Sequence, residues 1–258
     1  MTTIHPSAVV DPRAELGVGV SVGPFSVIEA GVRVGDRCQI GPHVVLSGHT
    51  TLGSGNRVFP HNAIGGIPQD LKYAGEDTRL EIGDDNTFRE FMTVNTGTVG
   101  GGGVTRIGNG NLFMAYVHIA HDCIIGDGAI LANAVTLAGH VTVEDRAVIG
   151  GLTAVHQFSR IGQLAMIGGC SAVDQDVPPF CLAIGNRVTL RGLNLTGLKR
   201  AGLSREAVRD LRDAYALLFS EQTPLADTIP QVRSRWPDDP RVATLTGFLE
   251  SSERGVCR

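Results

Sequence analysis

Two histidines, His118 and His121, lie three residues apart in the segment VHIAHDC, and Asp122 directly follows the second. An imidazole can take up a proton near neutral pH, and a neighbouring carboxylate can hold and polarise it. On a helix, this spacing would place both imidazoles on one face and would suggest a metal site. A catalytic pair, a metal site and a structural role are therefore all open until the surrounding elements are known.

An apolar residue recurs every six positions along most of the chain. The series runs from Ile4 to Ile64, resumes from Ile82 to Val94 and continues from Ile107 to Val173, about 26 units in all. Six residues make a short strand and a turn, which cannot bury an apolar residue alone, so the units must stack. An ordinary β-sandwich would need period-2 runs of varied length, and these are absent.

This pattern resembles that of hexapeptide-repeat proteins, which fold as a left-handed parallel β-helix with three units in each coil of 18 residues. The resemblance implies about nine coils and a prism on the order of 40 Å long. Two insertions, residues 65–81 and 95–106, interrupt the repeat. We expect a mainly β domain at 1–185 and a C-terminal α-helical domain at 186–258.

Helix signals begin after the repeat ends near Pro178. Ser204 is a candidate N-cap for the segment SREAVRDLRDAYALLF. Thr223 precedes Pro224 and Asp239 precedes Pro240, both in the order of an N-cap followed by a proline at the first helical position.

The six-residue register predicts where each histidine lies on the β-helix. Because Ile119 points inward, His118 points outward and His121 lies near a corner, so the helical metal face is ruled out. His121 and His140 are 19 residues apart and fall on adjacent coils, and His156 follows about one coil later. His43 and His61, which are 18 apart, should stack directly. The imidazoles therefore predict a site with general-base chemistry.

Other chemistries lack support in the sequence. No Cys–His or carboxylate spacing closes a metal shell, so we expect no metal. No Gly-x-Ser-x-Gly elbow is present, and no cysteine lies in a nucleophile context. We therefore expect no covalent intermediate.

The composition narrows the class of protein. With 42% hydrophobic and 19% charged residues, the chain is globular. A net charge of −4 argues against general nucleic-acid binding. The first ten residues contain no basic or long apolar segment, so we expect no secretory signal. No apolar run approaches the roughly 18 residues of a membrane span. The five cysteines are scattered, which indicates reduced thiols and a cytoplasmic protein.

Six segments in order resemble the UDP-N-acetylglucosamine acyltransferases that begin lipid A synthesis. They are QDLKYAGE, HIAHDC, LAGHVTV, IGGLTAVHQF, IGGCSAVDQDVPP and GLKRAGLS. The resemblance implies direct transfer of a 3-hydroxyacyl chain from acyl carrier protein to the 3-position of the UDP-sugar, with no cofactor. It also implies a homotrimer with clefts between subunits.

The resemblance also assigns site residues. His121 would be the general base, Asp122 would hold it, and the Gly139 N–H would stabilise the oxyanion. Substrate-binding positions would be Gln69, Asp70, Lys72, His118, His140, His156, Gln157, Gly169, Asn194 and Arg200. Among these, Arg200 would bind phosphate, and Gly169 would leave the acyl groove open for a long chain. Candidate contacts for the acidic acyl carrier protein are Lys199, Arg200, Arg205, Arg209 and Arg212.

Some positions depart from the common family pattern. Asn95 and Thr96 stand where His and Arg are usual, Thr196 stands where an acidic residue is common, and Ala201 replaces a basic residue. The 3-amino analogue of the sugar therefore stays open as acceptor. Three further functions also stay open, namely the later N-acyltransferase of the pathway, a coenzyme A-dependent acetyltransferase and a non-catalytic hexapeptide scaffold.

Overall fold

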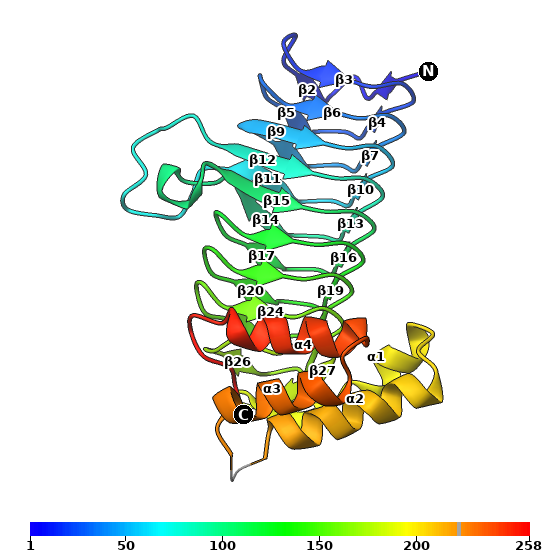
Figure 1. Ribbon diagram of the computed structural model, residues 1–258. Helices are drawn as coiled ribbons and strands as arrows, with labels where there is room; N and C mark the ends of the chain where they lie inside the picture. Colours follow the sequence, from blue (N-terminus) through cyan, green and yellow to red (C-terminus); the bar gives the residue numbers. More distant parts are fainter. Residues whose placement is uncertain (221–222) are drawn as a thin grey trace.

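The computed structural model describes residues 1–220 and 223–258. The chain winds into a three-sided prism of stacked coils, with the C-terminal helices at one end (Figure 1). Each side of the prism is a sheet of parallel strands, most of them two residues long.

The three sheets share the strands in rotation. Sheet A contains β1 (Thr3–Ile4), β4 (Ser21–Val22), β7 (Gln39–Ile40), β10 (Arg57–Val58), β13 (Thr87–Phe88), β16 (Leu112–Phe113), β19 (Ile130–Leu131), β22 (Val148–Ile149), β25 (Met166–Ile167), β27 (Cys181–Ile184) and β28 (Thr189–Leu193). Sheet B contains β2 (Val9–Val10), β5 (Val27–Ile28), β8 (Val45–Leu46), β11 (Ala63–Gly66), β14 (Thr93–Asn95), β17 (His118–Ile119), β20 (Thr136–Leu137), β23 (Ala154–Val155) and β26 (Ala172–Val173). Sheet C contains β3 (Glu15–Leu16), β6 (Arg33–Val34), β9 (His49–Leu52), β12 (Arg79–Ile82), β15 (Val104–Ile107), β18 (Ile124–Ile125), β21 (Thr142–Val143) and β24 (Arg160–Ile161).

The pairing confirms the predicted β-helix. Away from the insertions, paired residues are one coil apart, as in the pair Val27 and Val45 and the pair His118 and Thr136. The second residue of each two-residue strand points inward, so the aliphatic series forms one continuous core. Ile4 was predicted to be buried but is 47% exposed, because no coil covers the first one.

Both insertions leave the prism at the corner between sheets B and C. The first loop, residues 67–78, joins β11 to β12, and the second loop, residues 96–103, joins β14 to β15 and contains the short 3₁₀ helix η1 (Val99–Gly101). The flanking strands run a few residues into the predicted insertions 65–81 and 95–106. The two loops lie close together on one side of the prism (Figure 1). We call this corner the histidine corner, because it also carries His121 and His140.

The C-terminal region closes the lower end of the prism. β27 still pairs in parallel with β25, and β28 returns antiparallel to β27, so helix begins only at α1 (Leu195–Arg200). It is followed by α2 (Arg205–Leu218), α3 (Leu225–Arg235) and α4 (Pro240–Glu250). These elements share a second apolar cluster that includes Phe180, Leu198 and Leu211. The division at residue 185 stays a prediction.

Two of the three predicted helix caps are confirmed. Ser204 accepts a hydrogen bond from the Ala207 N–H, and Asp239 accepts from the Arg241 and Val242 N–H groups. The Thr223–Pro224 prediction is wrong, because Pro224 itself is the N-cap and α3 begins one residue later, with no side-chain cap. A second proline, Pro230, lies inside α3.

The described helices are all too short or too polar to cross a membrane.

Candidate active site

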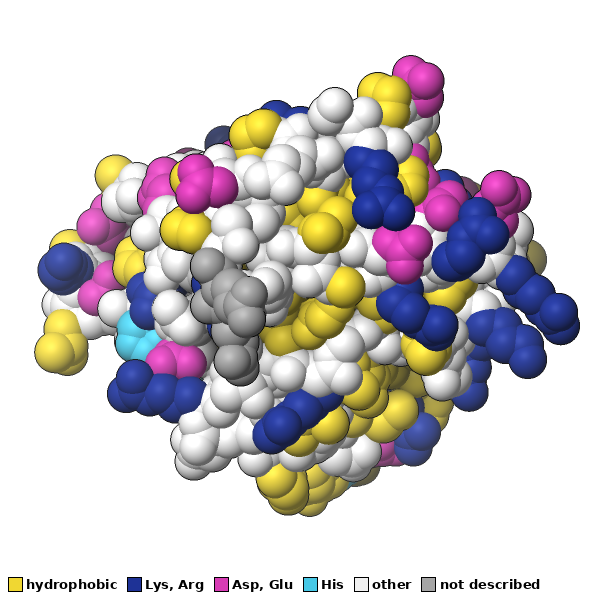
Figure 2. Space-filling model, turned by 60° about the horizontal axis from the view of Figure 1, so that its bottom comes forward, with side chains coloured by type: hydrophobic (Ala, Val, Ile, Leu, Met, Phe, Trp, Pro, Cys, Tyr) yellow, Lys and Arg dark blue, Asp and Glu magenta, His cyan; other side chains and the backbone are white. Residues whose placement is uncertain are grey.

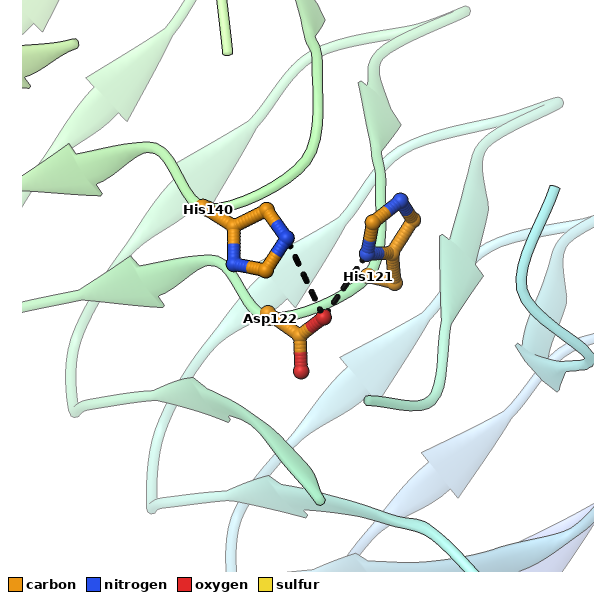
Figure 3. Close-up of side chains that lie close together, drawn as sticks. All are labelled: His121, Asp122 and His140. Atoms are coloured by element: carbon orange, nitrogen blue, oxygen red, sulfur yellow. Dashed lines mark hydrogen bonds and ion pairs between the residues drawn. The ribbon is translucent and has the colours of Figure 1, made fainter. Parts of the chain in front are cut away.

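His121 and Asp122 form a close pair at the histidine corner (Figure 3). Nδ1 of His121 lies 2.7 Å from Oδ2 of Asp122. Asp122 is the corner residue with a left-handed backbone (φ 60°), a conformation that Asp tolerates better than most residues. Its side chain is only 1% exposed, whereas that of His121 is 14% exposed. The carboxylate is therefore shielded, and one edge of the imidazole reaches solvent.

The buried Asp122 carboxylate is held by the second loop. Oδ1 accepts a hydrogen bond from the Thr98 backbone N–H at 2.8 Å, and Oδ2 accepts one from the Thr98 hydroxyl at 2.6 Å. The Asp122 N–H in turn donates to Oγ1 of Thr105 in β15 at 2.8 Å. An ionised carboxylate only accepts, so the Nδ1 atom of His121 must carry the hydrogen, and Nε2 keeps its lone pair.

Gly139 lies against the His121 ring from the next coil. A Cβ atom on Gly139 would lie 2.5 Å from Cε1 and 2.7 Å from Nε2 of His121, so a side chain there would displace the ring. Within the described part of the chain, the Gly139 N–H donates no backbone hydrogen bond, although the neighbouring Ala138 and His140 N–H groups do. A backbone N–H without such a partner is the kind of donor that can stabilise an oxyanion.

His140 lies across Asp122 from His121. Its Nε2 is 3.7 Å from Oδ2 of Asp122, and the rings of His121 and His140 meet edge to face at 5.1 Å (Figure 3). Burial lowers the pKa of His140, an effect that Asp122 partly opposes. The ring of Phe158 stacks on His140 at 4.4 Å. The environment of His140 thus favours its neutral form more than water does.

His118 points outward from β17, as predicted, and is half-buried. Its Nδ1 lies 2.7 Å from Oγ1 of Thr93 on the preceding coil. Burial, followed by the proximity of His121, lowers the pKa of His118.

The first loop brings two of the predicted substrate-binding residues close to His140. Asp70 and Lys72 line a hollow of about 310 Å³ together with Thr98 of the second loop, His140 and Phe158. Asp70 also accepts a hydrogen bond from the Lys72 N–H at 3.0 Å, which shapes this turn of the loop. Gln69 is exposed and does not line this hollow.

The remaining predicted residues lie elsewhere. His156 and Gln157 are exposed at the histidine corner one coil further on. Phe158 rather than His156 occupies the position stacked on His140, because it follows His140 by a full coil of 18 residues. The predicted stack of His43 and His61 is confirmed at 5.0 Å, on the corner between sheets A and B.

Gly169, Asn194 and Arg200 lie at other corners. Gly169 is exposed at the turn between β25 and β26, where sheets A and B meet. Asn194 is the buried N-cap of α1, and its Nδ2 donates to the carbonyl of Leu164 at the corner between sheets C and A. Arg200 is exposed in the last turn of α1. Within one chain, these residues are therefore not brought to His121.

His121, Asp122 and His140 also form the one group in the described residues whose atoms lie close enough to share an ion, all within 4.8 Å. Two ligands of a tetrahedral zinc ion would be about 3.4 Å apart. The His121 and Asp122 atoms are 2.7 Å apart, which is a hydrogen-bond distance. The His121–Asp122 contact is therefore a hydrogen bond, and its length does not suit two ligands of one zinc ion.

Cys123, which follows this pair, is no candidate nucleophile. Its thiol is fully buried and lies 3.2 Å from the carbonyl oxygen of Ala138. Burial raises the pKa of Cys123 to about 12, so the reactive thiolate is absent at neutral pH.

The sequence patterns did not identify Thr98 or Phe158 as parts of the site. Phe158 could have been found from its spacing of 18 residues after His140. Thr98 lies in an insertion, where the six-residue register gives no information about what the chain approaches.

Known proteins match nearly the whole chain. Residues 176–257 match the family described as "Udp N-acetylglucosamine O-acyltransferase; Domain 2", and residues 13–48 and 105–139 match "Bacterial transferase hexapeptide (six repeats)". The acyl-[acyl-carrier-protein]–UDP-N-acetylglucosamine O-acyltransferase of Sulfurovum sp. is 54% identical over 99% of this chain and 98% of its own. That of Thermodesulfovibrio yellowstonii is 48% identical over the full length of both.

Solved structures are also similar. LpxA from Acinetobacter baumannii has a TM-score of 0.96 and 41% identity, covering 99% of both chains. UDP-N-acetylglucosamine acyltransferase from Campylobacter jejuni has a TM-score of 0.94 and 40% identity, with the same coverage. Sequence identity of this extent over whole chains, together with the same fold, shows that this chain belongs to the acyl-[acyl-carrier-protein]–UDP-N-acetylglucosamine O-acyltransferase family.

Proposed function

We propose that this protein transfers a 3-hydroxyacyl chain from acyl carrier protein to the 3-hydroxyl of UDP-N-acetylglucosamine, in the cytoplasm, as the first step of lipid A synthesis. Family membership over nearly the whole chain supports the reaction. The 2.7 Å contact between Nδ1 of His121 and Oδ2 of Asp122 is the observation that carries the mechanism.

His121 acts as the general base. Asp122 fixes the hydrogen on Nδ1, so the free Nε2 accepts the proton of the attacking hydroxyl. The hydroxyl oxygen adds to the carbonyl carbon of the thioester and forms a tetrahedral intermediate. The Gly139 N–H stabilises its negative oxygen.

Collapse of the intermediate breaks the carbon–sulfur bond. The protonated His121 returns its proton to the departing thiolate of acyl carrier protein, and the ester remains on the sugar. Each proton taken up in the first half of the reaction is released in the second, so no cofactor is needed.

The complete site requires more than one chain. His121 lies at the corner between sheets B and C, whereas α1, with Asn194 and Arg200, lies at the corner between sheets C and A, on the side of the lower end away from the inserted loops (Figure 1). If Arg200 binds the nucleotide phosphate, it must belong to a neighbouring copy. We therefore propose a homotrimer with one cleft at each subunit boundary.

The acyl chain has a path along the outer face of sheet B. The outward residues there are small, namely Thr136, Ala154 and Ala172, which pair in register on successive coils. This face runs from the histidine corner to the corner with Gly169. Gly169 adds no side chain to that end, so a long acyl chain fits.

The basic side chains of α1 and α2 are proposed to receive acyl carrier protein, which is acidic. Lys199, Arg200, Arg205, Arg209 and Arg212 are all exposed. Figure 2, with the helical end brought forward, shows Lys and Arg side chains along one side of this face. Such a contact should weaken as salt is added.

A 3-amino sugar is a second candidate acceptor. Asn95, which stands where the family usually has His, is 94% buried, and its Nδ2 donates to the carbonyl of Ile67 at 2.8 Å. Its Oδ1 has no partner within the described chain. An amine can donate one more hydrogen than a hydroxyl, and such a donor would suit an acceptor that has no partner within the chain.

Product identification by mass tests the proposal. Purified protein is mixed with UDP-N-acetylglucosamine or its 3-amino analogue, together with 3-hydroxyacyl carrier proteins of several lengths, at low and high salt. We expect an ester of the first sugar, with a KM for acyl carrier protein that rises with salt. An amide alone would assign the second acceptor, and the absence of product with every pair would contradict the proposal.

A further inference from the structure

The Asp122 carboxylate is almost completely shielded from solvent by its protein partners. Its side chain is 1% exposed. Its two oxygens receive the Thr98 N–H at 2.8 Å, the Thr98 hydroxyl at 2.6 Å and the His121 Nδ1–H at 2.7 Å. One residue, Thr98, thus supplies two of the three close donors, one to each oxygen.

The Thr98 hydroxyl is committed to Asp122 rather than to its own helix. Thr98 is the N-cap of η1, with an extended backbone (φ −121°, ψ 155°), but its side chain makes no capping hydrogen bond. Because a carboxylate only accepts, the single hydroxyl hydrogen must point at Oδ2. Oδ2 is then shared by the Thr98 hydroxyl and His121, so both set the direction in which the carboxylate faces.

Hydrogen bonds within and around the second loop fix the backbone of Thr98. The Thr98 carbonyl oxygen accepts hydrogen bonds from the Gly101 N–H at 3.0 Å and the Gly103 N–H at 2.7 Å. The Thr96 N–H donates to the Gly66 carbonyl at 3.0 Å, and the Gly97 N–H donates to the Arg79 carbonyl at 3.1 Å. The loop is therefore tied to strands β11 and β12 of the prism.

Gly101 shows how closely the loop covers the carboxylate. A Cβ on Gly101 would overlap the Asp122 carboxylate, whereas a Cβ on the adjacent Gly100 would meet no atom within 4 Å. A residue without a side chain is thus needed at position 101, which faces Asp122, but not at position 100.

We propose that Thr98 is a positioning residue for the reaction: its N–H and hydroxyl together fix the Asp122 carboxylate, which in turn fixes the tautomer and orientation of His121. This inference rests on the proposed role of His121 as general base. The second inserted loop then has a function in catalysis besides any contact with substrate.

The test compares steady-state rates and melting temperatures of Thr98→Val, Thr98→Ser, Thr78→Val and His121→Ala. Thr78→Val is the matched control, since its buried hydroxyl bonds Thr96 at the base of the loops and does not touch Asp122. We expect Thr98→Val to lower kcat by about 10- to 100-fold with little change in KM for the sugar, because a small misplacement of the base is costly. Thr98→Ser should restore most of the rate, and Thr78→Val should keep it.

A double variant separates positioning from general stability. If Thr98 acts through His121, Thr98→Val should cost almost nothing further in the His121→Ala background. An unchanged kcat in Thr98→Val, an equal loss in Thr78→Val, or a full additional loss in the double variant would each overturn the inference while leaving the role of His121 intact. An unchanged rate in His121→Ala would overturn both.

Discussion

The ring of His121 packs directly against the backbone of Gly139, so closely that a single added methyl group would lie 2.5 Å from its Cε1 atom. Gly139, which makes this contact, also carries a backbone N–H that donates no backbone hydrogen bond within the described residues. The two residues come from adjacent coils, and a coil spacing of about 4.8 Å is what brings them together.

Gly139→Ala should therefore damage catalysis more than stability. The new Cβ would displace the imidazole from its present position, and we expect kcat to fall about 100-fold. Steady-state kinetics and thermal unfolding would measure the two effects. Gly247→Ala in α4 is a matched control, because a Cβ there meets nothing within 4 Å. A Gly139→Ala enzyme with normal kcat would mean that the ring needs no such contact.

Gly169→Met should shorten the preferred acyl chain. A Cβ at this exposed corner would lie 3.1 Å from the carbonyl oxygen of Gly151, a tight but tolerable fit, and the rest of the side chain would fill the proposed groove end. The preference is measured as kcat/KM for acyl carrier proteins of different chain lengths. An unchanged preference would show that the groove ends elsewhere.

Stability should depend on pH through His118 and His140. Burial lowers the pKa of both imidazoles in the folded protein, whereas in the unfolded chain they have the ordinary pKa of 6.5. Below that pH the unfolded chain therefore binds more protons than the folded protein does. The free energy of unfolding is therefore fully retained above about pH 6.5 and decreases as the pH falls through that value towards the lowered ones. We expect Tm to fall between about pH 8 and about pH 5.5, and to fall less in a His118→Asn/His140→Asn double variant at the same protein concentration. Equal falls in both proteins would assign the effect to other groups.

Two inactive variants should complement each other if the site spans two chains. His121→Ala and Arg200→Ala would each inactivate every site in their own assemblies. Co-expressed, they would form mixed assemblies in which some sites combine an intact His121 from one chain with an intact Arg200 from another. Activity of the co-purified mixture is the readout. A mixture no more active than either parent would contradict a shared site.

The fold could be predicted because the repeat is local and strictly periodic. Each unit needs only its neighbours one coil away, so the position of an aliphatic residue determines which side chains point inward. The prediction was wrong where a residue has no neighbouring coil on one side or lies outside the repeat. Ile4 has no coil above it and is exposed. Pro224 precedes α3 instead of starting it, because proline suits both positions and the sequence does not separate them.

The candidate site was predicted in part for the same reason. His121 and His140 were expected on adjacent coils, and their rings are 5.1 Å apart. The contact of Thr98 with Asp122 joins residues 24 positions apart across an insertion, where neither period nor propensity constrains the path. Asn194 and Arg200 lie at a different corner of the prism from His121. The six-residue repeat describes the fold of one chain, so it cannot predict which residues of a neighbouring copy would approach His121.

The most direct test is the rate of acyl transfer by His121→Ala, measured as kcat with the donor and acceptor identified by mass. General-base catalysis contributes about 10²–10⁴-fold, so we expect kcat to fall by that factor while the protein keeps its melting temperature. A folded His121→Ala protein that transfers the acyl chain at the wild-type rate would remove His121, and with it the pair it forms with Asp122, from the mechanism.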